Sequence, residues 1–155
     1  MANGRAAASV AAAAVGYARP DVRSVAGVSV NGAVLLGSLL AVHKSWAWFV
    51  IIGNGLAGLW SLGAIRLPSL RTRALWWFTA ATQVAVFVQV AMGVGMVAGQ
   101  KRVAPQFHMF YGFVAIIAVA IIYSYRNQMR HKLYLLYGLG GLFLMGMGIR
   151  SMILA

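Results

Sequence analysis

The sequence has no cysteine, no glutamate and a single aspartate, Asp21, among its 155 residues. Without cysteine, the chain has no disulfide, no cysteine-ligated zinc or iron–sulfur site and no thiol nucleophile. One carboxylate cannot supply a catalytic acid pair or a carboxylate site for a hard metal. It also cannot form a relay of acidic groups for proton transport. We therefore expect no independent catalytic activity.

Charged residues of both signs are scarce, at 9%, whereas 62% of the residues are hydrophobic. Soluble domains carry about a quarter charged residues, so this composition excludes an ordinary soluble fold. Apolar runs near membrane-spanning length, separated by short polar segments, account for most of the chain. The composition indicates one integral membrane domain.

The hydropathy pattern predicts an all-α, polytopic transmembrane bundle of about five helices. The expected helices cover about 25–42, 46–65, 74–99, 105–125 and 133–155. The first is short and contains the polar residue Asn31. His43, Lys44 and Ser45 form the expected turn between the first two helices, a turn of minimal length.

Residues 1–24 precede the expected helices and have a different composition. An Ala-rich run over 6–14 follows Arg5 and resembles a weak signal-peptide core. The alternative is a flexible cytoplasmic tail, because alanine favours helix but is weakly lipophilic. We favour the tail, since cleavage would invert the charge distribution described next. The expected organisation is a tail, 1–24, and a transmembrane domain, 25–155.

The net charge of +12 raises the question of nucleic acid, and the placement of the basic residues answers it. They lie in short groups between apolar runs, with no polar, basic face for a duplex, so we expect no nucleic-acid partner. With the N-terminus inside, nine lysines and arginines fall on the inner side and four on the outer side. This bias predicts a multi-pass protein of the cell (cytoplasmic) membrane with its N-terminus inside and its C-terminus outside. The outer four are Lys44, Lys101, Arg102 and Arg150.

Two of the three histidines, His43 and His108, fall at the outer face in this topology, and His131 falls inside. Membrane bundles build cofactor sites from side chains on facing helices, and a haem iron takes one or two axial ligands. Two histidines at matching depth on different helices meet this minimum requirement. The other interpretation is that each is an interfacial polar residue. Arg150, at the same level, would pair with haem propionates or contact lipid headgroups.

A short motif adds a resemblance to a known family. Gln89-x-x-x-Gly93, a short outer turn and His108 at the start of the next span resemble the repeated half of heme A synthase. His43 and His108 each lie at the outer start of a span, in alternate spans of the chain, and fit the same arrangement over residues 43–125. Cytochrome-b-type four-helix membrane proteins look similar at this level.

The resemblance implies that His43 and His108 are the axial ligands of a b-type haem at the outer face, with Gln89 close to them. The family has two such halves in one chain and an acidic residue beside its first histidine. This chain has one half and no glutamate. The resemblance therefore implies haem binding, for electron transfer or haem handling, but not haem oxidation.

Stripes of small residues support a second interpretation. Gly138, Gly141 and Gly148 fall on one helical face, as do residues 33, 37 and 41. Such stripes let helices approach closely, so we expect a homo-oligomer or a complex with other membrane proteins in the lipid bilayer. A non-catalytic accessory or assembly subunit would use the same faces. A small-solute carrier lined by Asn31, Asn54, Gln83 and Gln89 is a third interpretation.

Overall fold

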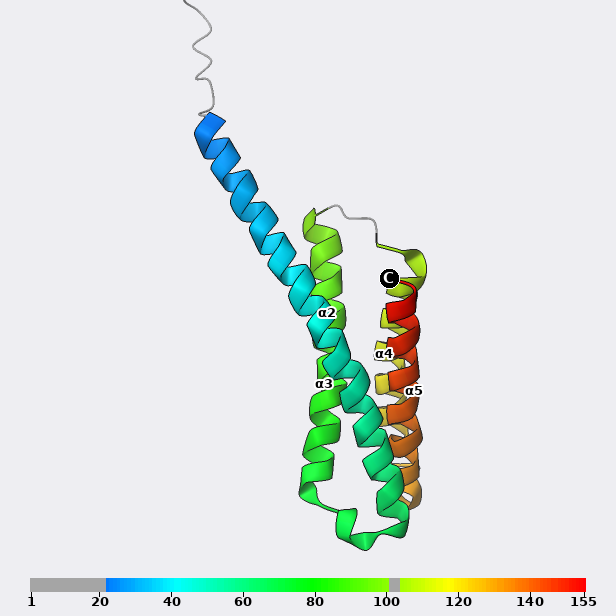
Figure 1. The fold of residues 1–155 in the computed structure, drawn as a ribbon. Helices are drawn as coiled ribbons and strands as arrows, with labels where there is room; N and C mark the ends of the chain where they lie inside the picture. The colour runs from blue at the N-terminus through cyan, green and yellow to red at the C-terminus, as the bar shows by residue number, and fades with distance from the viewer. Residues whose placement is uncertain (1–21, 101–103) are drawn as a thin grey trace, which may run out of the picture. The chain divides into compact units, whose positions relative to one another are not determined.

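The computed structural model of the chain describes residues 22–100 and 104–155, which contain four long α-helices. These are α2 (Val22–Arg66), α3 (Arg73–Gln100), α4 (Gln106–Tyr125) and α5 (Leu133–Ile153) (Figure 1). Two short 3-10 helices, η1 (Pro68–Leu70) and η2 (Arg130–Lys132), lie in the α2–α3 and α4–α5 connections. The described ranges contain no β-strand, which confirms the all-α class.

The chain divides into two compact units, Met1–Leu35 and Leu36–Ala155. In the first unit, described residues 22–35 are helical and form the start of α2. Most of the predicted tail, residues 1–21, lies outside the described part of the chain. The second unit holds the rest of α2 with α3, α4 and α5.

The predicted turn at His43–Ser45 is wrong, because α2 continues through these residues without interruption. No glycine or proline occurs between residues 38 and 52, so nothing in the local sequence ends the helix there. The connections that do form have stronger signals. Pro68 lies between α2 and α3, and the segment 126–132, in which six of seven residues are polar, separates α4 from α5.

Four helices in the described ranges, rather than the expected five, are long and apolar enough to cross a membrane. They are Gly37–Arg66, Arg73–Gly99, Gln106–Tyr125 and Arg130–Ile153. The last three predicted helices agree with these bounds to within a few residues, whereas the helix predicted over 46–65 begins at Gly37 or earlier. The length and composition of these helices are consistent with a multi-pass membrane protein.

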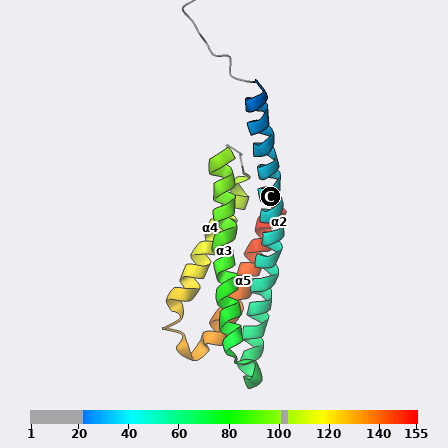
Figure 2. The same ribbon diagram turned by 90° about the vertical axis from the view of Figure 1, so that its left-hand side faces the viewer.

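Neighbouring helices of the second unit run antiparallel, and the two ribbon views agree on this arrangement (Figures 1 and 2). A shared core takes residues from all four helices: Val50, Ala85, Val86, Ala115, Ala118, Val119, Ile122 and Leu144. Outside this core, large apolar side chains such as Leu56, Phe113 and Leu139 are exposed on every helix. An apolar exterior around a small core is what a lipid solvent requires of a helical bundle.

Glycines bring α2 and α5 into close contact. A Cβ atom at Gly141 would lie 2.7 Å from the backbone oxygen of Asn54 and 2.9 Å from Cα of Gly58. A Cβ atom at Gly148 would lie 2.7 Å from Cγ1 of Ile51. The predicted small-residue face of the last helix therefore packs inside the bundle, against α2.

The buried amide of Asn54 connects α2 to α3. Its side chain is 1% exposed, and Nδ2 donates to the backbone oxygens of Val50 at 2.9 Å and Thr82 at 3.2 Å. A buried polar group in a bundle of this kind needs such partners, because leaving it unpaired costs about 1–3 kcal/mol. These bonds fix how α2 is rotated against α3. His43 lies earlier in the same helix, so its direction depends on that rotation.

Candidate functional site

His43 and His108 lie beside each other in the folded chain, although 65 residues of sequence separate them. His43 belongs to α2 and is 8% exposed, and His108 lies in the first turn of α4 and is half-buried. Their ring centroids are 6.1 Å apart, and the ring planes meet at 66°. The predicted proximity of these two histidines is therefore present in the structure.

The α3 residues of the Gln89-x-x-x-Gly93 motif hold His43. The amide nitrogen Nε2 of Gln89 lies 3.2 Å from Nε2 of the His43 ring and 3.2 Å from the His43 backbone oxygen. One helical turn later, a Cβ atom at Gly93 would lie 3.4 Å from Cε1 of the same ring. The amide thus anchors the imidazole, and the glycine leaves room for its edge.

These hydrogen bonds indicate which nitrogen of His43 carries the proton. The amide nitrogen has two N–H groups, and here one donates to the backbone oxygen and the other to the ring. With the opposite amide orientation, the side-chain oxygen of Gln89 would face the backbone oxygen of His43. Both atoms only accept hydrogen bonds, so neither could donate to the other. In the arrangement shown, Nε2 of His43 is therefore the acceptor and Nδ1 carries the proton.

His108 has a partner on α5. Its Nδ1 lies 3.0 Å from the backbone oxygen of Ser151 and 3.1 Å from Oγ of Ser151. The Ser151 hydroxyl donates in turn to the His108 backbone oxygen at 3.3 Å. Because a carbonyl oxygen only accepts, Nδ1 is the protonated nitrogen and Nε2 holds the free lone pair. Metal-binding histidines commonly show this pattern, in which one N–H bonds a carbonyl and the other nitrogen binds.

Two buried polar atoms at this site lack a hydrogen-bond partner among the described residues. They are Nδ1 of His43 and Oε1 of Gln89. An unsatisfied buried polar group costs about 1–3 kcal/mol. Such atoms in a native structure call for an explanation such as an ion, a ligand or a water molecule. The site is thus two imidazoles, a buried amide and a serine, one group from each of the four helices.

The remaining predicted site residue, Arg150, is exposed near the end of α5 and makes no hydrogen bond with the histidines. Its neighbour Ser151 contacts His108 instead, and the sequence analysis missed it. The available signal was a small hydroxyl residue in the last turn of a span at the depth of His108. Lys101 and Arg102, also expected at this level, lie outside the described residues.

The donor set is limited to two imidazoles. Within residues 22–100 and 104–155, no group of three or more histidine, cysteine or acidic side chains comes together. A closed four-ligand structural site of the zinc type is therefore not built from this part of the chain. Axial ligation of a macrocycle, which brings its own equatorial nitrogens, needs only the two.

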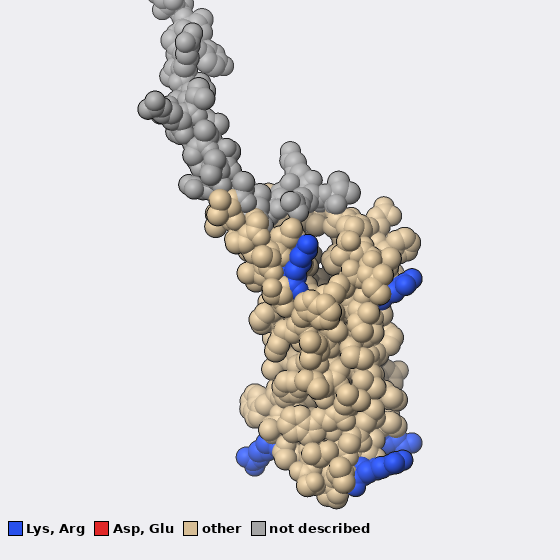
Figure 3. Space-filling model, in the orientation of Figure 1, with Lys and Arg blue, Asp and Glu red and all other residues tan. Residues whose placement is uncertain are grey.

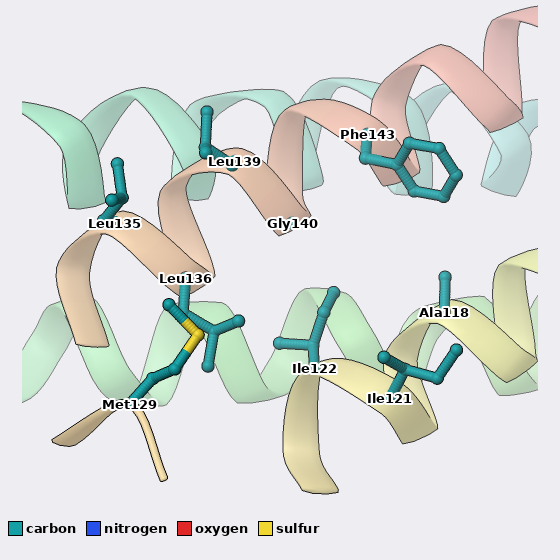
Figure 4. Close-up of a pocket in the computed structure, with 9 residues that line it drawn as sticks. All are labelled: Ala118, Ile121, Ile122, Met129, Leu135, Leu136, Leu139, Gly140 and Phe143. Carbon is teal, nitrogen blue, oxygen red and sulfur yellow. The ribbon is translucent and has the colours of Figure 1, made fainter. Parts of the chain in front are cut away.

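An apolar groove lies elsewhere, between α4 and α5 (Figure 4). It has a volume of about 360 Å³ and is lined by Ala118, Ile121, Ile122, Met129, Leu135, Leu136, Leu139, Gly140 and Phe143. None of these side chains offers a strong hydrogen-bonding group, so the groove cannot orient a polar ligand. The histidine pair therefore remains the candidate site.

Comparison of the chain with protein-family models, with curated proteins and with solved structures finds no match in any of the three.

Proposed function

We propose that this multi-pass membrane protein binds one b-type haem through His43 and His108, for electron transfer or haem handling. The observation that carries the proposal is the spacing of the two imidazoles, whose centroids are 6.1 Å apart on different helices. A metal–imidazole bond is about 2 Å long, so two imidazoles on opposite sides of one iron have ring centres about 6 Å apart. The ring spacing fits that arrangement.

The hydrogen bonds around the rings also fit the role. Ser151 holds Nδ1 of His108, which leaves the Nε2 lone pair for an axial bond. His43 offers Nδ1, which is buried and has no partner. Ligation through Nδ1 would require the ring proton to move to Nε2 and the Gln89 amide to rotate, so that its oxygen accepts from Nε2 in place of the present amide bond to the His43 backbone oxygen. The buried Nδ1 of His43 would then have a partner.

Gln89 and Ser151 act as positioning residues in this proposal, since each touches a histidine rather than the iron. When bound, a bis-imidazole haem supplies one-electron redox chemistry. The protein contributes the ligands, their protonation states and an apolar surround. From the resemblance to heme A synthase, the proposal keeps haem binding alone, because the acid and the second half of that family are missing.

The distribution of charge supports an orientation for the bundle. Two connections at one end of residues 36–155, together with the helix ends beside them, carry six cations: Arg66, Arg71, Arg73, Arg126, Arg130 and Lys132. Figure 3 shows blue side chains at this end and others toward the opposite end, separated by a broad band without Lys, Arg, Asp or Glu side chains on the face in view. By the positive-inside rule, this end faces the cytoplasm in a cell membrane, and the histidine pair lies toward the outer face.

The test is a reduced-minus-oxidised absorption spectrum of protein purified in detergent after expression with ample haem. Wild type, His43→Ala, His108→Ala and His131→Ala are compared. His131 is the matched control, because it is exposed in η2, in the α4–α5 connection. We expect a haem band in wild type and His131→Ala, and its loss in the other two variants.

A colourless wild type would overturn the proposal. A band that survives both His43→Ala and His108→Ala would also overturn it, because the haem would then be held elsewhere. Each variant is checked for folding by its helical circular dichroism, so that loss of haem is not confused with loss of the bundle.

A second candidate function, a non-catalytic accessory or assembly subunit, is favoured by small residues that the bundle leaves uncovered. A Cβ atom at Gly95, Gly99 or Gly146 would meet no other atom within 4 Å. Gly95 and Gly99 form a G-x-x-x-G pair on the exposed side of α3, a spacing that supports close helix association in membranes. Co-purification with a membrane complex that persists in the His43→Ala/His108→Ala double variant would favour this candidate.

A further inference from the structure

A second pocket, of about 420 Å³, lies where α4 joins α5. It is lined by Trp76, Arg126, Asn127, Arg130, Leu133 and Tyr137. Ligand pockets commonly have volumes of about 300–1,000 Å³ and combine apolar walls with a few polar groups. This pocket matches both features, and none of its residues belongs to the histidine site.

The two arginines of this pocket have no anionic partner among the residues that the structure describes. The only carboxylate side chain of the sequence, Asp21, lies outside the described residues. The guanidinium groups of Arg126 and Arg130 make no hydrogen bond or ion pair with another residue of the described ranges. Arg126 instead lies over the ring of Tyr123, with Cζ 4.4 Å from the ring centroid.

Arg71, at the same end of the bundle, shows the contrasting arrangement. Its guanidinium donates to the backbone oxygens of Ala64 at 2.8 Å and Ile65 at 3.0 Å. Arg71 is therefore used within the fold, whereas the planar forks of Arg126 and Arg130 remain available. Such forks match the geometry of a phosphate group and bind it with two parallel hydrogen bonds.

The walls of the pocket suit a lipid rather than a small soluble anion. Arg126 follows the last residue of α4 and Leu133 is the first residue of α5, so the pocket lies at the end of two candidate membrane spans. Trp76 is held against Tyr137, with ring centroids 5.4 Å apart. A tryptophan and a tyrosine at a span end are typical of the headgroup level of a bilayer.

We propose that this pocket binds the phosphate of an anionic phospholipid, with Arg126 and Arg130 as the cationic ligands. Asn127, the Tyr137 hydroxyl and the Trp76 indole N–H are the uncharged hydrogen-bonding groups of the pocket. The rings of Trp76 and the side chain of Leu133 contact the glycerol and upper acyl region. Basic pockets between membrane helices are known to take lipid headgroups in this way. The proposal does not depend on haem binding by the histidines.

Native mass spectrometry of delipidated protein in detergent tests the proposal. Dioleoyl phosphatidylglycerol and dioleoyl phosphatidylcholine, which share acyl chains, are titrated against wild type and two double variants. Arg126→Gln/Arg130→Gln removes the pocket cations. Arg66→Gln/Arg73→Gln is the matched control, because it removes two exposed cations from the same end that do not line the pocket.

We expect one preferentially retained phosphatidylglycerol in wild type and in the control. The pocket variant is expected to bind it about thirtyfold more weakly. Equal weakening in both double variants would overturn the proposal, since general surface charge would explain it. Equal retention of phosphatidylcholine would overturn it as well.

Inorganic phosphate serves as the competitor that separates lipid from soluble phosphate. Displacement of the lipid at phosphate concentrations close to those of the lipid itself would show that the pocket recognises a free phosphate, which contradicts the lipid assignment.

If the glutamine variant fails to fold, Arg126→Lys/Arg130→Lys replaces it. Lysine keeps the charge but lacks the fork, so weaker binding than wild type is still expected; unchanged binding would contradict the proposal.

Discussion

Single residues decide how closely α2 and α5 approach. Gly58 and Gly141 face each other across the interface, and the nearest atoms to a Cβ at Gly141 belong to the backbone of α2. A backbone atom cannot rotate away as a side chain can. Any larger residue at Gly141 must therefore separate the two helices.

For Gly141→Ala we expect a loss of about 1–3 kcal/mol in the free energy of unfolding, as for overpacked cores. The measurement is thermal unfolding in detergent, followed by circular dichroism. Gly146→Ala on the same helix is the control, because a Cβ there meets nothing within 4 Å. The control should be neutral or gain up to about 1 kcal/mol from helix propensity. Equal stability of the two variants would contradict the close α2–α5 contact.

Three of the residues that meet at the site could be predicted from the sequence, but the partner of His108 on α5 could not. His43, Gln89 and His108 were identified from their positions at helix ends and from a short motif, and the fold brings these three together. The charge of Arg150 predicts a role at the site, whereas nothing in the sequence analysis points to Ser151. Neighbouring residues on a helix point about 100° apart, so the rotation of α5 decides which of them meets His108.

Specific side-chain contacts, as well as residues such as proline, determine where α2 ends. The last carbonyl groups of α2 have no partner within the helix, and Arg71 donates to two of them, on Ala64 and Ile65. The same guanidinium lies 5.3 Å from the centroid of the Tyr134 ring on α5. Trp60 Nε1 donates to the backbone oxygen of Leu70 and closes the connection from the other side.

Replacing Arg71 by alanine removes the two bonds to α2 and the contact with Tyr134. We expect the free energy of unfolding to fall by about 1 kcal/mol, since each net hydrogen bond contributes about 0.5–1.5 kcal/mol and the group is exposed. Chemical unfolding in mixed micelles would measure the change. Arg73→Ala, which removes a nearby charge with no such bonds, should have a smaller effect. A larger effect at Arg73 would show that charge, rather than capping, stabilises this end.

The predicted turn at residues 43–45 is an error in the extent of one helix, α2. Three polar residues, 43–45, between two apolar runs predict a connection. Histidine, lysine and serine are all compatible with helix, so polarity alone does not end one. In the structure, this polar stretch lies within a continuous helix and presents His43 to α3 and α4.

At the scale of the whole molecule, the number of membrane crossings changes the topology argument. The prediction of an inside N-terminus required a turn at residues 43–45, and the uninterrupted α2 removes that support. The six cations in the two connections still favour a cytoplasmic location for η1 and η2. Both connections should therefore lie on the same side of the membrane.

Single cysteines introduced into this cysteine-free chain test the topology. Ser69→Cys in η1 and Gln128→Cys before η2 should both react with a membrane-impermeant maleimide only after the cells are opened. Ala155→Cys, at the end of the chain after α5, should react in intact cells. Labelling of the Ser69 and Gln128 variants from opposite sides would contradict four antiparallel crossings of residues 37–153.

The sequence by itself determined the all-helical class, the apolar exterior and most helix bounds, because these depend on local composition and on breaks at proline, glycine and charge clusters. The tertiary structure alone decided that Gly141 packs on Gly58, that Gln89 holds His43 and that Ser151 holds His108. Each of these contacts joins helices far apart in the sequence. Such contacts depend on how every helix is rotated and crossed against its neighbours, and a one-residue change of register moves a different side chain into place.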